Sequence, residues 1–60
     1  MYEIFHNIDG EKTTTLNNTA EFIHFMRSIA IENGDEDISI TCVTEALDYL
    51  NNFCENLTLL

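Results

Sequence analysis

Four side chains of the types that bind transition metals are spread along the chain: His6, His24, Cys42 and Cys54. Structural zinc sites usually take their ligands in close pairs, whereas the nearest two here, Cys42 and Cys54, stand twelve positions apart. The patterns place His6 on the hairpin face opposite Ile4, His24 in solvent and Cys54 on an apolar helix face. The sequence therefore predicts no metal or other cofactor, and a small metal-binding protein is kept only as an alternative.

Carboxylates are the second group that could do chemistry. An EF-hand loop aligned on Gly10 or on Gly34 has an apolar residue at its first and last ligand positions, so neither register fits. The compact run Asp35-Glu36-Asp37 is expected to be a solvated loop, with a weak Ca²⁺ site as the alternative. The chain has no glycine-rich phosphate loop and no nucleophile elbow, and 60 residues seldom enclose a cleft. We therefore expect no enzyme.

The charge balance is the most informative feature. The chain has eleven acids and two bases, a formal net charge of −9, and residues 28–60 contain seven of the acids and no base. Such a chain repels nucleic acid and anionic membranes but attracts a basic protein surface. The expected partner-binding residues are the clustered acids and two aromatics that the helical period places at the flanks of their helices: Glu32, Asp35, Glu36, Asp37, Glu45, Asp48, Glu55, Tyr49 and Phe25.

Five elements are expected to position these side chains. Residues 2–16, including Ile8, predict a hairpin around Asp9-Gly10. Apolar spacing predicts helices over 19–33 and 45–56, capped by Asn18 and Thr44, and the alternation of residues 38–43 predicts a third strand. The resulting order is ββαβα: one α+β domain, residues 1–60, with both helices on one face of a three-stranded, mostly antiparallel sheet.

The apolar tail Leu57–Leu60 has three possible places: the core, a sheet edge or a dimer interface. Because so short a chain is marginally stable, a homodimer through this tail is expected as a possible assembly. The first residues contain no basic leader region, and no apolar run approaches the roughly 20 residues that span a bilayer. Two cysteines fit a reducing compartment, so the expected location is the cytoplasm, that of a host cell if the protein is viral.

In size and charge the chain resembles the small acidic proteins that viruses and mobile elements use against host nucleases and transcription machinery. This resemblance implies an inhibitor that presents carboxylates to a basic, nucleic-acid-handling protein, in the manner of a nucleic-acid mimic. Two alternatives stay open. One is a self-associating structural or regulatory module whose charge only maintains solubility, and the other is the metal-binding protein.

Overall fold

The computed structural model describes residues 1–7 and 9–60, so the part of the predicted hairpin at Ile8 lies outside the described residues. Strands β1 (Tyr2–Asn7) and β2 (Glu11–Leu16) pair antiparallel, in a register that runs from Tyr2 opposite Leu16 to Asn7 opposite Glu11. Gly10 has a φ of +108°, a conformation that favours glycine. The predicted hairpin is confirmed over these residues.

Helix α1 (Thr19–Glu32) begins and ends almost where the sequence predicts. The Asn18 carboxamide Oδ1 accepts a hydrogen bond from the Glu21 amide at 2.9 Å, and Glu21 Oε1 accepts one from the Asn17 amide at 3.0 Å. At the other end Gly34 has a φ of +81°. Its amide bonds the Ile31 carbonyl and the Asp35 amide bonds the Ala30 carbonyl, the Schellman arrangement that closes a helix on a glycine.

Helix α2 (Val43–Phe53) begins two residues earlier and ends three residues earlier than predicted. Its N-cap is Cys42, so the cap predicted at Thr44 is wrong. Instead of a capping side chain at Cys42, the Glu45 carboxylate reaches back and accepts hydrogen bonds from the Thr41 amide at 2.9 Å and the Thr41 hydroxyl at 2.6 Å. Both helices thus begin with a glutamate at the third helical position that bonds the residue before the cap.

The α+β class is confirmed, but the element order is ββααβ and not ββαβα. The strand predicted over 38–43 is wrong: residues 38–42 form an irregular connection and Val43 begins α2. Burial nevertheless alternates over residues 38–41, with Ile40 only 2% exposed. The third strand is β3 (Leu57–Leu59), which pairs antiparallel with β1 to give the order β2-β1-β3. The tail therefore takes the edge-strand place beside β1, and because this edge of β1 is already paired with β3, residues 38–42 pack against the helices outside the sheet.

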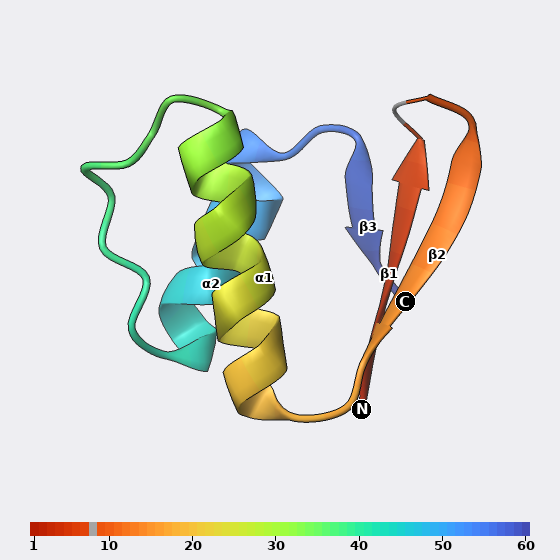
Figure 1. Cartoon of the computed structure of the whole chain (residues 1–60), viewed down its shortest axis with the longest axis horizontal. Coiled ribbons are helices and arrows are strands. Elements are labelled where there is room, and N and C mark those ends of the chain that lie inside the picture. The colour runs from red at the N-terminus through yellow and green to blue at the C-terminus, as the bar shows by residue number, and fades with distance from the viewer. Residues whose placement is uncertain (8) are drawn as a thin grey trace.

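Both helices lie on one side of the sheet, as predicted, with the 33–42 connection on the far side of the helices from β2 (Figure 1). The core between the layers is formed by one inward set of buried side chains: Ile4, Leu16, Phe22, Met26, Ala30, Ile40, Ala46, Tyr49, Leu50 and Leu57. Tyr2 stacks on Phe22 with ring centroids 4.5 Å apart. Within the described residues, no helix has the length and apolar character needed to cross a membrane.

Candidate acidic binding surface

The seven predicted acids all lie in the helical layer and its connections, outside the strands: Glu32 at the end of α1, Asp35, Glu36 and Asp37 in the 33–42 connection, Glu45 and Asp48 on α2, and Glu55 between α2 and β3. Five of them are exposed, whereas Asp35 and Glu45 are half-buried. The set is therefore spread over the helices and loops rather than confined to one helix face, and two of its members have structural roles.

Asp35 is held by Tyr49. The Tyr49 hydroxyl donates a hydrogen bond to Asp35 Oδ2 at 2.8 Å and accepts one from Asn33 Nδ2 at 3.1 Å. Asn33 and Asp35 flank Gly34 in the Schellman turn, so the Tyr49 phenol links both sides of this turn to α2. Tyr49 is only 2% exposed, so its predicted place at the flank of the helix is wrong and it offers a partner almost no surface.

Burial of the Tyr49 ring raises the pKa of its phenol; the hydrogen bond from Asn33 lowers this pKa, while the bond to Asp35 and the negative charge of Asp35 raise it further. The pKa of the Glu45 carboxyl is lowered, mainly by the hydrogen bonds from the Thr41 side chain and backbone. The phenol therefore stays protonated and Glu45 stays ionised over a wide pH range. Both groups serve the fold, Tyr49 as a donor and Glu45 as an acceptor.

Phe53 is the surface residue that the sequence analysis missed. Its position on the helical period assigns it to the apolar face of α2, yet it is the last residue of the helix and is 56% exposed. Its ring stacks on the buried Tyr49 ring, with centroids 5.1 Å apart and planes 20° apart. Because large aromatic side chains contribute much of the contact energy at protein interfaces, we single out Phe53 as a candidate contact residue.

Two shallow hollows meet at Phe53. One, of about 190 Å³, is also lined by Glu45, Asp48 and Asn52. The other, of about 100 Å³, is also lined by Glu32, Asn33, Glu55 and Asn56. Carboxylates thus line both hollows that Phe53 borders, accompanied by side-chain amides that can accept or donate hydrogen bonds. We call Phe53 together with Glu32, Asp48, Asn52 and Glu55 the Phe53 surface.

The second predicted aromatic contact, Phe25, lies elsewhere. It is half-buried and lines an apolar hollow with Leu16, Ala20 and His24 on the β2 side of α1. The structure therefore does not bring Phe25 together with the seven acids of residues 28–60.

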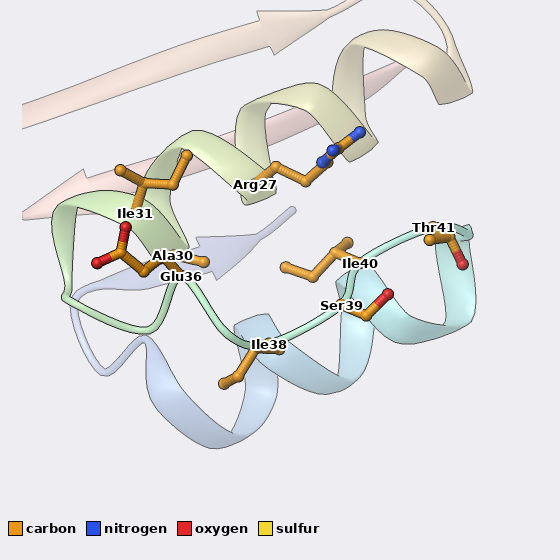
Figure 2. Close-up of a pocket in the computed structure, with 8 residues that line it drawn as sticks. All are labelled: Arg27, Ala30, Ile31, Glu36, Ile38, Ser39, Ile40 and Thr41. Atoms are coloured by element: carbon orange, nitrogen blue, oxygen red, sulfur yellow. The ribbon is translucent and has the colours of Figure 1, made fainter.

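A further hollow, of about 140 Å³, lies between α1 and the 33–42 connection (Figure 2). Ile40 points toward α1 there, whereas Arg27 and Glu36 lie at different ends of the hollow in this view. Neither Glu36 nor Asp37 lines the two hollows at Phe53. We accordingly leave both residues outside the Phe53 surface.

The metal alternative gains no support from the geometry. Among residues 1–7 and 9–60, no three His, Cys, Asp or Glu side chains are placed to hold a metal ion. The predicted face of His6 is wrong, because its ring meets Phe25 edge-on at 5.6 Å and its Nε2 is enclosed without a hydrogen-bond partner in the described part of the chain. His24 is exposed, as predicted. Burial, and then the charge of Asp35, raise the pKa of the Cys54 thiol, which disfavours the thiolate that metals bind.

Comparison with protein-family models, with curated proteins and with solved structures finds no match for this chain.

Proposed function

We propose that the protein binds the basic surface of another protein through the Phe53 surface, and that it acts there as an inhibitor or regulator of a nucleic-acid-handling partner. The observation that carries the proposal is an exposed aromatic ring that lines two hollows, each with acidic residues in its lining. The charge of the chain favours the same partner class, since residues 28–60 contain seven acids and no base. No catalytic step is part of the proposal.

The chemistry of this surface suits arginine in particular. A guanidinium can lie on an aromatic face and at the same time bond a carboxylate with two parallel N–H groups. At an exposed site the cation–π contact contributes about 0.5–1 kcal/mol, and each exposed ion pair contributes about 0.2–1 kcal/mol. Several such contacts are therefore needed for tight binding, which favours a partner with a row of bases, such as one that binds nucleic acid.

The remaining predicted contacts differ in availability. Glu36 and Asp37 are exposed and add to the long-range attraction. Asp35 and Glu45 already accept hydrogen bonds from Tyr49 and Thr41, so a partner that engaged them would compete with the fold. We therefore assign the short-range contacts to Glu32, Asp48, Glu55 and Phe53.

The proposal is tested by two matched charge-reversal pairs. Asp48→Lys with Glu55→Lys changes the Phe53 surface, whereas Glu3→Lys with Glu11→Lys changes two exposed acids of the hairpin; each pair moves the net charge from −9 to −5. Tagged protein captures its partner from a lysate, salt elutes the partner, and the purified partner is titrated with each variant. We expect the first pair to abolish binding and the second to leave most of it.

Equal loss with both pairs would mean that only the overall charge matters and would overturn the assignment to the Phe53 surface. Binding that is unchanged between low and high salt would overturn the electrostatic proposal itself, because exposed charges are screened by salt. Phe53→Ala separates the aromatic contact from the charge: it keeps the net charge at −9 and should weaken binding about fivefold or more, the equivalent of roughly 1 kcal/mol.

A further inference from the structure

Strand β2 has an unpaired edge. The Asn7 amide bonds the Asn56 carbonyl and the Leu60 amide bonds the Glu3 carbonyl, so the odd-numbered residues of β1 direct their backbone groups toward β3. In an antiparallel sheet, successive residues direct their backbone N–H and C=O groups to opposite sides of the strand. The even-numbered residues of β1 therefore bond the even-numbered residues of β2, and the odd-numbered residues of β2 direct their amides and carbonyls away from the sheet. Among the described strands β2 pairs with β1 alone, which leaves the backbone groups of Glu11, Thr13 and Thr15 unpaired by the sheet.

The β2 edge lacks most of the features that usually prevent strand pairing. Such edges are shortened, bulged, or interrupted by proline or several charges. The other edge strand, β3, has three residues, whereas β2 has six in a continuous register without a bulge, and the chain has no proline. Three consecutive threonines also favour strand pairing. Lys12 and Glu11 are its charged residues, and their charges cancel.

An apolar hollow lies directly beside this edge. It measures about 410 Å³ and is lined by Leu16 of β2 and by one flank of α1, including Ala20, Glu21 and Phe25. Leu16 lies on the helix-covered face of the sheet. A strand added next to β2 would therefore direct the side chain opposite Leu16 toward this hollow.

We propose that a second copy of the chain occupies this edge, so that two β2 strands pair antiparallel and join two sheets into one of six strands. With Thr14 opposite its own copy on the twofold axis, Thr13 lies opposite Thr15 and both use their free backbone groups. Lys12 then lies opposite Leu16 of the other copy. Its aliphatic stem enters the hollow and its ammonium comes near Glu21, whose Oε2 is not needed for the cap bond made through Oε1.

Charge favours a second copy over a basic peptide at this edge. Residues 11–16 have a net charge of zero, and the register pairs Lys12 with Glu21 twice across the interface. The seven acids of residues 28–60 lie outside the strands, and β2 stands at the side of the molecule opposite the 33–42 connection (Figure 1). Two copies joined through β2 therefore keep their acidic connections apart, which weakens the repulsion between two chains of charge −9 relative to a contact between the connections.

The first test is sedimentation equilibrium of the full chain across a roughly hundredfold dilution at physiological salt. We expect a monomer–dimer equilibrium for the wild type. Thr13→Pro removes an amide that points away from the sheet, a place where an edge strand tolerates proline, and should abolish the dimer. A wild type that stays monomeric at every concentration, or a dimer that Thr13→Pro leaves intact while circular dichroism shows an unchanged fold, would overturn the proposal.

The second test needs no proline and uses the two bases of the chain as a matched pair. Lys12→Glu and Arg27→Glu each lower the net charge from −9 to −11, but only Lys12 lies at the proposed interface. We expect Lys12→Glu to weaken dimerisation at least tenfold and Arg27→Glu to change it less than threefold. Equal effects would show that only net repulsion is measured and would contradict the proposed interface.

The register itself is tested by oxidative cross-linking in a Cys42→Ser/Cys54→Ser background. Directly opposed residues of a non-hydrogen-bonded antiparallel pair have Cα atoms about 4.5 Å apart, within disulfide range. Thr14→Cys should therefore cross-link rapidly, and Thr13→Cys, displaced from its own copy along the strand, slowly. A faster cross-link from Thr13→Cys would overturn the register. All three readouts are independent of whether the Phe53 surface binds a basic partner.

Discussion

Tyr49→Phe is the substitution that probes most directly how the fold holds its acidic connection. It keeps the buried ring and its stack on Phe53 and removes only the hydroxyl that bonds Asp35 and Asn33. Hydrogen bonds to charged groups contribute about 1.5–3 kcal/mol. Because Asp35 is half-buried and water can replace the phenol, the lower end of this range applies. We expect a loss of about 1.5 kcal/mol in the free energy of unfolding, which lowers the Tm by roughly 6–12 °C for a chain of this size.

Urea unfolding followed by circular dichroism at neutral pH measures this free energy, and calorimetry measures the Tm. Tyr2→Phe is the matched control: the Tyr2 hydroxyl lies 3.3 Å from Thr19 Oγ1 in an exposed position, so its loss should cost less than about 0.5 kcal/mol. If Tyr49→Phe is as stable as the wild type, the link between α2 and the residues around Gly34 does not contribute to stability and our reasoning about Asp35 is wrong.

Three further outcomes are expected from the same part of the fold. Gly34→Ala forces an alanine to a φ of +81° and should cost about 1 kcal/mol by urea unfolding; an unchanged midpoint would contradict the Schellman turn. The folded-state pKa values of Tyr49 and Cys54 are raised, so their contribution is present at neutral pH and lost as the pH rises through those values. The Tm of the wild type should therefore fall in alkali more steeply than that of Tyr49→Phe/Cys54→Ser, and parallel curves would refute this. The pKa of Glu45 is lowered, so its contribution is lost as the pH falls; Glu45→Gln should flatten the acid side of the Tm curve, and an unchanged slope would refute the role of the Thr41 bonds.

The parts of the fold with local sequence determinants could be predicted. The hairpin follows from β-forming residues around Asp9-Gly10, and α1 follows from Asn18, Glu21 and Gly34, each of which does in the structure what its type predicts. These features depend on neighbours in sequence, so a single chain suffices to identify them.

The third strand could not be predicted because it depends on a contact distant in sequence. Residues 38–43 alternate apolar and polar side chains, and the tail is mostly apolar, so either segment could form a strand. Only one of them can pair with the free edge of β1. The tail takes that place, whereas Ile40 is buried in the core although it does not belong to a strand. Because β3 begins at Leu57, residues 54–56 have to turn the chain from α2 into the sheet, and the Leu57 amide bonds the Cys54 carbonyl in this turn. The helix therefore stops at Phe53 and not at residue 56.

The acidic residues of the candidate site could be predicted from the sequence, but its central residue, Phe53, could not. The acids follow from composition, but periodicity reads Phe53 as core and Tyr49 as flank, the reverse of what the structure shows. Tyr49 packs in the core and its hydroxyl bonds Asn33 and Asp35, which are 16 and 14 positions away in the sequence. One sequence does not show such a contact.

The most direct test of the central claim is an NMR titration of the isotope-labelled protein with an arginine-rich peptide at physiological salt. The Phe53 surface predicts saturable shifts at the amides and side chains of Asp48, Asn52, Phe53 and Glu55, lost in Phe53→Ala. Shifts spread equally over the hairpin acids Glu3 and Glu11, unchanged in Phe53→Ala, would contradict it.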